Sequence, residues 1–260
     1  MTSALTIAGS DSSGGAGIQA DLKTFAAHGV FGLSAVTAVT AQNRVGVTAI
    51  HAVPAAIVTN QIEAVVSDFD VGAAKTGMLL TAEIVEAVVA CLETLAVPNP
   101  VVDPVMIATS GDRLLVEDAL NALKTRLVCR ASVITPNRPE AELLTGHAIT
   151  SLADTRDAAR RIHDMGAAAV IITGGHAPGP DVVDLLYDGH EFIEFRAPRI
   201  PIRNGHGTGC TFGAAVTAEL ALGRPLAEAT RRAQTYVAHC LRYALPAERG
   251  QGPLNHFWHE

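Results

Sequence analysis

A glycine-rich stretch near the end of the sequence combines features of an anion site with a cysteine. It reads Asn204-Gly205-His206-Gly207-Thr208-Gly209-Cys210-Thr211, and the apolar residues that follow recur at helical spacing. A loop that opens a helix directs backbone N–H groups and the positive end of the helix dipole at one point, which suits a phosphate or a developing oxyanion. A cysteine in a first helical turn has a stabilised thiolate. We therefore predict an anion site beside Cys210; the alternative is helix capping around a small buried cysteine.

Glycines, amides and carboxylates also follow the predicted strands. In an open parallel sheet, ligands bind at the carboxyl ends of the strands, so these residues are candidates for one polar rim. Each is also compatible with turn or helix-cap chemistry. The stretches are Gly9 to Gly17, Gln42-Asn43, Lys75 to Met78, Asp103-Pro104-Val105, Thr135-Pro136-Asn137 with Glu140, and Thr173 to His176.

Two carboxylates in this rim are the candidate ligands of a metal ion. Asp103 and Glu140 offer the oxygen atoms that Mg²⁺ prefers, and that ion often keeps its waters and bridges to substrate phosphates. A positioned nucleophile, a metal ion and a cradle for the transferred group supply most of the catalysis in phosphoryl transfer. The residue types therefore favour that reaction class.

Alternating strands and helices must hold these residues in place. This βαβ rhythm is typical of a parallel sheet covered on both faces, which is an α/β fold. Two further runs flank a DG-type turn and predict an antiparallel edge. With no repeat and no linker, we expect one domain over residues 1–260. The predicted strands are 5–8, 33–39, 71–75, 101–103, 131–134 and 169–172, the edge runs are 182–187 and 192–196, and the predicted helices are 18–26, 57–66, 82–95, 117–127, 154–165, 210–220 and 226–241.

Composition excludes several other classes. The net charge of −7, with no basic cluster beyond the pair Arg231-Arg232, argues against a nucleic-acid partner and favours a small molecule. The start lacks a basic region and no apolar run is long enough for a membrane span, so we expect a cytoplasmic protein. The four cysteines lie far apart without a CxxC pair, so neither zinc nor a disulfide framework is indicated.

A dinucleotide-binding oxidoreductase is the main rival on local motifs. Gly15-Ala16-Gly17-Ile18-Gln19-Ala20 matches G-x-G-x-x-A at a helix start, but no acid occurs between Asp21 and Glu63 to bind the ribose. The sequence has no Gly-Lys dipeptide, which excludes a Walker-type NTPase. It also has no G-x-S-x-G, which disfavours a serine hydrolase.

The chain as a whole resembles the bacterial hydroxymethylpyrimidine/phosphomethylpyrimidine kinases of thiamine biosynthesis, in the ribokinase-like superfamily. The resemblance covers nearly the whole chain in order and implies a three-layer αβα fold with a mostly parallel central sheet. The matching stretches are Ala8 to Phe25, Thr40-Ala41-Gln42-Asn43, Lys75 to Leu79, Val102 to Met106, Thr135 to Glu140, His206 to Cys210, and the tail Gly252-Pro253-Leu254-Asn255-His256-Phe257.

The resemblance implies an ATP-dependent kinase. It would phosphorylate the hydroxymethyl group of 4-amino-5-hydroxymethyl-2-methylpyrimidine and then the monophosphate. Cys210, with a pKa lowered by the helix start, would take the hydroxyl proton, while the amides of Gly207, Thr208 and Gly209 hold the transferred phosphoryl group. ATP and Mg²⁺ are the implied cofactors, K⁺ is a further candidate, and a homodimer is expected, with no membrane partner.

The same resemblance assigns the remaining site residues. Gln42 would read the pyrimidine, since its amide offers both a donor and an acceptor. Asp21 would lie near the ring or its hydroxymethyl group. Asn137 and Glu140 resemble an N-x-x-E pair that holds magnesium and phosphate, with Asp103 in the same network. The expected cavity walls are Gly9, Ala16, Met78 and Val105, and the further nucleotide-binding residues are Thr173 and Gly175.

The sequence departs from the family pattern at three points. Thr109, Thr173 and Gly205 stand where relatives commonly carry other residues, two of them lysines, so two cationic side chains near the phosphates are missing. A glycine-rich lid is expected around Thr109 to Asp112. Two other functions stay open: a pyridoxal kinase of the same fold, and a pyrimidine-binding protein with weak catalysis.

Overall fold

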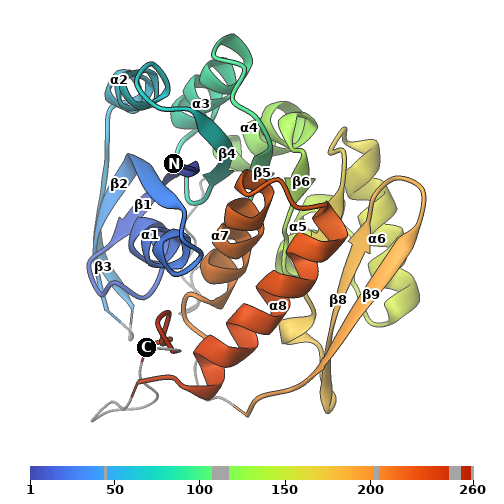
Figure 1. The fold of residues 1–260 in the computed structure, drawn as a ribbon. Helices are drawn as coiled ribbons and strands as arrows, with labels where there is room; N and C mark the ends of the chain where they lie inside the picture. The colour runs from blue at the N-terminus through green and yellow to red at the C-terminus, as the bar shows by residue number, and fades with distance from the viewer. Residues whose placement is uncertain (44–45, 107–116, 202–204, 246–252, 259–260) are drawn as a thin grey trace.

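A single mixed sheet runs through the part of the chain that the computed structural model describes, which is residues 1–43, 46–106, 117–201, 205–245 and 253–258. Helices cover both faces of the sheet (Figure 1), which confirms the predicted three-layer α/β fold. The strand order is β3-β2-β1-β4-β5-β6-β7-β8-β9. The strands are β1 Ser3–Asp11, β2 Phe31–Gln42, β3 Val47–Ala52, β4 Val71–Thr76, β5 Pro100–Val102, β6 Val133–Ile134, β7 Val170–Ile172, β8 Asp181–Tyr187 and β9 Phe192–Pro198.

The helices divide between the two faces. On one face α1, α7 and α8 pack on the sheet through apolar residues such as Phe25, Phe212 and Val216. The other face carries α2 to α6, with a core that includes Ile62 and Val88. The helices are α1 Gly17–Ala27, α2 Ala55–Val66, α3 Ala82–Thr94, α4 Glu117–Ala122, α5 Arg138–Thr145, α6 Leu152–Asp164, α7 Thr208–Ala221 and α8 Leu226–Arg242.

The middle strands are parallel and the strands at both edges are antiparallel. The pairs from β2 through β1, β4, β5 and β6 to β7 run parallel, as predicted from the βαβ rhythm. The β8–β9 hairpin pairs antiparallel with β7, which confirms the predicted antiparallel edge. Parallel strands bring their carboxyl ends to one edge, so the loops after them meet there.

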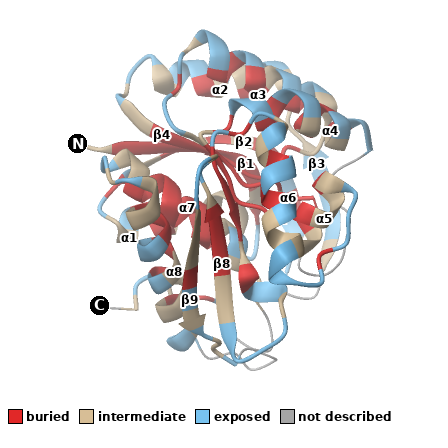
Figure 2. Ribbon diagram, turned by 90° about the vertical axis from the view of Figure 1, so that its right-hand side faces the viewer, coloured by how far each residue is buried: buried red, intermediate tan, exposed pale blue. Residues whose placement is uncertain are grey.

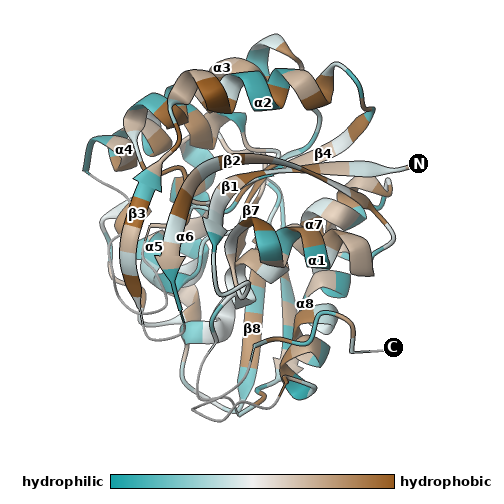
Figure 3. Cartoon of the chain, turned by 90° about the vertical axis from the view of Figure 1, so that its left-hand side faces the viewer, coloured by the Kyte–Doolittle hydropathy of each residue, from teal (hydrophilic) through white to brown (hydrophobic). Residues whose placement is uncertain are grey.

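Strand β3 was not predicted. It pairs antiparallel with the end of β2, and four of its six residues are exposed. Without a buried face, the strand has no hydrophobic alternation for sequence analysis to detect. Figure 3 shows apolar residues on β2 and β3 at this outer edge, where Val39 and Ile50 are exposed.

Helix α7 is the most deeply placed helix of its layer. Figure 2 shows it largely in the red of buried residues, like the strands beside it. Gly213 allows α7 to approach β4 closely, because a Cβ atom at this position would lie 3.0 Å from Cε of Lys75 on β4. The first turn of α7 therefore reaches the carboxyl ends of the strands.

Candidate active site

A cavity of about 630 Å³ opens at the carboxyl ends of the parallel strands. The end of β2 and the loops after β1, β4, β5, β6 and β7 contribute to its wall, together with the start of α7 and one side of α8. All but one of the predicted site residues line it. They are Gly9, Ala16, Gln42, Met78, Asp103, Val105, Asn137, Glu140, Thr173, Gly175, Gly207, Thr208, Gly209 and Cys210.

The anion loop, residues 205–210, has the geometry of a helix start. Gly207 precedes the first helical residue with φ +84°, a left-handed conformation that favours glycine. A Cβ atom there would lie 1.8 Å from the carbonyl oxygen of Gly15, so the loop rests directly on the backbone of the N-terminal loop. The hydroxyl of Thr208 donates to Gly205 O at 2.7 Å and closes the turn. The opening turn of α7 thus faces the cavity with its amides.

A clasp between Asp11 and His206 joins the N-terminal loop to the anion loop. His206 Nε2 lies 2.9 Å from Asp11 Oδ2. The same carboxylate accepts bonds from Ser13 N, Ser13 Oγ and Ala16 N. Burial opposes ionisation, but these bonds lower the pKa of Asp11. Sequence analysis missed the clasp, because nothing in the sequence pairs residues 195 positions apart.

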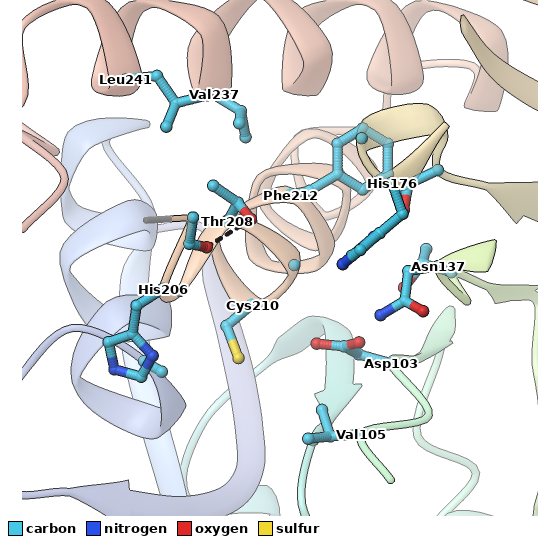
Figure 4. Close-up of a pocket in the computed structure, with 18 of the residues that line it drawn as sticks. Asp103, Val105, Asn137, His176, His206, Thr208, Cys210, Phe212, Val237 and Leu241 are labelled. Carbon is cyan, nitrogen blue, oxygen red and sulfur yellow. Dashed lines mark hydrogen bonds between the residues drawn. The ribbon is translucent and has the colours of Figure 1, made fainter. Parts of the chain in front are cut away.

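Cys210 directs its sulfur into the cavity, on the side of Asp103 (Figure 4). Its electrostatics contradict the expectation of a lowered pKa. Burial raises the pKa of the thiol to about 12; the charge on Lys75 opposes this shift, and Asp103 and Asp21 add to it. The helix start is therefore outweighed, and the thiol of the ligand-free chain is protonated at neutral pH.

Lys75 belongs to the predicted rim, but its burial between two carboxylates beside Cys210 was not predicted. Lys75 is fully buried, and its Nζ lies 3.3 Å from Asp21 Oδ2 and 3.1 Å from Asp103 Oδ2. Burial alone would lower its pKa, but the two carboxylates raise it above the usual range, so the ammonium is charged. A lysine at the end of an otherwise apolar strand was the available signal.

Asp21 requires a correction. We expected it near the pyrimidine, but it is fully buried on α1 and is not part of the cavity wall. Thr6 Oγ1 donates to it at 2.6 Å, and Lys75 is its other partner. Its carboxylate therefore stabilises the ammonium and has no contact with the cavity.

Asn137 and Glu140 form a capping box at the start of α5. Asn137 Oδ1 accepts from Glu140 N at 3.0 Å, and Glu140 Oε2 accepts from Asn137 N at 2.8 Å. Burial and the nearby Asp103 raise the pKa of Glu140 to about 8. Figure 4 shows Asp103 and Asn137 beside each other in the wall of the cavity.

These carboxylates fit a divalent cation held mainly by water and phosphate. No cluster of three or more acidic, histidine or cysteine ligands occurs within the described ranges. Mg²⁺ needs no such cluster, since it is commonly bound through one or two carboxylates together with substrate phosphates. Two observations agree with such a cation: the charge of Asp103 contributes to the raised pKa of Glu140, and the buried hydroxyl of Thr135 has no hydrogen-bond partner within the described ranges.

The far end of the cavity is apolar. Phe212 of α7 and Val237 and Leu241 of α8 face it (Figure 4). The turn Gly174–His176 borders this end, and buried Asp184 holds it by accepting from Gly174 N and Gln234 Nε2, both at 2.8 Å. This arrangement suits a flat heterocycle next to its phosphates.

Gln42 lies at the opposite end with a fixed backbone. Ser12 Oγ donates to Gln42 O at 2.7 Å and lies 2.8 Å from Gln42 N, and Thr40 Oγ1 donates to the side-chain oxygen at 3.1 Å. The amide is thereby oriented at the cavity wall.

The model of the phosphomethylpyrimidine kinase family matches residues 11–255. The chain belongs to this family. It is 48% identical over 255 residues to the hydroxymethylpyrimidine/phosphomethylpyrimidine kinase of Bacillus subtilis, covering 98% of this chain and 94% of that one. It is 51% identical over 254 residues to the thiamine biosynthesis bifunctional protein ThiED of Geobacter sulfurreducens; this covers 98% of the chain but only 52% of ThiED.

Among solved structures, the fold is similar to that of a pyridoxal kinase. The ADP complex of Bacillus subtilis pyridoxal kinase superimposes with a TM-score of 0.91 at 38% identity, covering 98% of this chain and 97% of that one. The likeness confirms the ribokinase-like architecture.

No helix in the described ranges could cross a membrane. Thr109 and the predicted lid 109–112 lie outside the described residues.

Proposed function

We propose that the chain transfers phosphoryl groups from ATP to 4-amino-5-hydroxymethyl-2-methylpyrimidine and then to its monophosphate. The observation that carries this proposal is the joint presence of Gln42 and Cys210 in one cavity, together with the family's kinase relatives. The oriented amide of Gln42 matches a ring nitrogen beside an exocyclic amine. In the proposed pose, the hydroxymethyl group would point towards the anion loop.

In the proposed reaction, the alcohol oxygen attacks the terminal phosphorus of ATP. The bond to the ADP oxygen breaks, and the alcohol proton passes to Sγ of Cys210. Because the thiol is protonated in the ligand-free chain, it must first release its proton to solvent water, and the charge on Lys75 favours that loss. The amides of Gly207, Thr208 and Gly209 hold the transferred group. Mg²⁺ at Asp103 and Glu140 would neutralise charge on the phosphates.

The nucleotide end of the proposal rests on the apolar surface of Phe212, Val237 and Leu241. Thr173 pairs with Asn137 in a backbone bridge and, with Gly175, would contact phosphates. Position 173 carries no lysine; Arg199 and His206 line the same cavity, and the basic side chain of the adjacent turn is His176. Its pKa is lowered by burial and by Arg138 and Arg199, so it would bind phosphate as a neutral donor.

Mass analysis of the products tests the proposal. The pyrimidine alcohol, ATP and Mg²⁺ should give the monophosphate first and the diphosphate later. Cys210→Ala should abolish transfer while pyrimidine binding persists, and Cys129→Ala, at an exposed cysteine, should behave like wild type. Full turnover by Cys210→Ala would remove the proposed role of the thiol.

A pyridoxal kinase is the second candidate, because a pyridoxal kinase is among the close structural neighbours. Pyridoxal also offers a hydroxymethyl group on a six-membered ring. Parallel assays of the two alcohols at equal concentration decide between them, and we expect the pyrimidine to give the higher kcat/KM. The remaining candidate, a pyrimidine-binding protein with weak catalysis, predicts no ATP consumption in either assay.

We also propose that the chain forms a homodimer in the cytoplasm, where ATP is abundant. Val39 on β2 and Ile50 on β3 are exposed at the sheet edge, and Ile57 is exposed on the following helix α2, with 52%, 39% and 48% of their surface accessible. Apolar groups gathered at one edge favour association with a second copy. Light scattering of the wild type should give twice the monomer mass, and the Ile50→Glu variant should give a mass closer to that of the monomer.

A further inference from the structure

The C-terminal tail, residues 253–258, is anchored along α8. Leu245 N donates to Pro253 O at 3.0 Å, and Asn255 N donates to Cys240 O at 3.2 Å. Tyr236 donates its hydroxyl proton to His256 O at 2.8 Å. Trp258 lies against the rings of His239 and Tyr243. Figure 1 shows this short dark red segment near the ends of α1 and α8. From Pro253 onward, the tail motif found in the sequence thus packs on α8.

His256 of the tail reaches the first turn of α7, the helix that carries Cys210. His256 is buried, and its Nε2 lies 3.1 Å from the hydroxyl oxygen of Thr211, the residue after Cys210. Burial and the charge on Lys23 lower the pKa of His256 to about 4, so the ring is neutral at neutral pH. A neutral imidazole has one donor and one acceptor nitrogen, and a threonine hydroxyl can satisfy either.

Thr211 differs from other threonines in the helical segments of this chain. Eight of these donate their hydroxyl proton to the carbonyl four residues earlier in the chain. For Thr211 that carbonyl belongs to Gly207 of the anion loop, which accepts the Thr211 N–H at 2.9 Å, while the hydroxyl pairs with His256. The eight are Thr24, Thr94, Thr125, Thr145, Thr155, Thr217, Thr230 and Thr235.

We propose that His256 is a positioning residue for phosphoryl transfer. Through Thr211 it fixes the first turn of α7, and with it the amides of the anion loop and the sulfur of Cys210. The inference rests on the proposed roles of that loop and that thiol. A group that only aligns the transferring phosphoryl group contributes to kcat and leaves KM largely unchanged.

The test compares two threonines of the same helix. Thr211 and Thr217 are both 0% exposed, and replacing either by valine removes a hydroxyl and keeps the shape. We expect Thr211→Val to lower kcat about tenfold with both KM values nearly unchanged, since small misplacements in an active site are costly. Thr217→Val should lower the melting temperature about as much as Thr211→Val does, but it should leave kcat unchanged. Thr211→Ser, which retains the hydroxyl, should restore kcat.

A second variant and a second measurement complete the design. His256→Gln should lower kcat like Thr211→Val, and the double variant should be no slower than either. Hydrogen exchange of amides 207–211 should rise in Thr211→Val and His256→Gln but not in Thr217→Val. Equal kcat losses in both valine variants, or unchanged exchange at 207–211, would overturn the proposal. An inactive wild type would refute the proposed function instead, and the exchange result would still decide the role of His256.

Discussion

The two ends of the cavity are held by different kinds of interaction. Around Cys210 the contacts are polar and buried: the Asp11–His206 clasp and the ammonium of Lys75 between Asp21 and Asp103. The other end presents Phe212, Val237 and Leu241. Fixed charges that meet the reacting atoms stabilise a transition state, whereas apolar surface binds substrate and transition state equally. We therefore expect variants at the first end to change kcat and variants at the second to change KM.

The largest effect should come from Lys75. Lys75→Met leaves two buried carboxylates without their cation, which typically costs about 3–5 kcal/mol of stability. Activity should fall at least about 100-fold, because the charge that favours the Cys210 thiolate is lost. Melting curves check the loss of stability, and steady-state kinetics check the loss of activity. The exposed pair Arg126–Glu86 is the control, and Arg126→Met should change stability by less than about 1 kcal/mol. A fully active Lys75→Met would break the comparison.

The second-largest effect on activity should come from the clasp between Asp11 and His206. His206→Gln and Asp11→Asn should each lower kcat about tenfold, since each releases the anion loop from the N-terminal loop. A double-mutant cycle on kcat measures the coupling, and the double variant should be little worse than either single one. Strictly additive losses would mean that the two side chains act separately.

At the apolar end, Leu241→Ala should raise KM for ATP about fivefold and leave kcat within about twofold, because it removes contact area without touching the reacting atoms. The KM for the pyrimidine should not change. A loss confined to kcat would contradict the division between the two ends.

The smallest effect concerns pH and the tail. The pKa of His256 is lowered from its usual 6.5 to about 4, so the unfolded chain binds more protons between these values. Stability is therefore fully present above about pH 6.5 and falls as the pH drops towards 4. The melting temperature of wild type should fall more steeply between these values than that of His256→Gln. Parallel slopes would show that His256 does not titrate with unfolding.

Much of the fold could be predicted because it depends on local patterns. Apolar strands alternate with amphipathic helices, and the rule for parallel sheets placed the polar rim correctly at the strand ends. Strand β3 escaped detection because four of its six residues are exposed, so only its pairing with β2 defines it.

The electrostatics of the site could not be predicted in the same way. The sequence places Cys210 at a helix start, which favours a thiolate, but it does not reveal that burial in the folded chain raises the pKa of the thiol, with Asp103 and Asp21 adding to the shift. Likewise Asp21 was expected in the cavity, because a motif does not show which side of α1 faces the sheet. Both errors concern long-range contacts, which only the folded chain defines.

The contact between Gly207 and Gly15 joins two loops that lie far apart in the sequence. A ribosome must therefore synthesise the chain through the start of α7 before this contact can form. Fragments ending ahead of α7 would contain all nine described strands and yet lack a phosphate cradle. Termination ahead of α7 should thus yield inert products, and a nascent chain should transfer no phosphoryl group until α7 has been made.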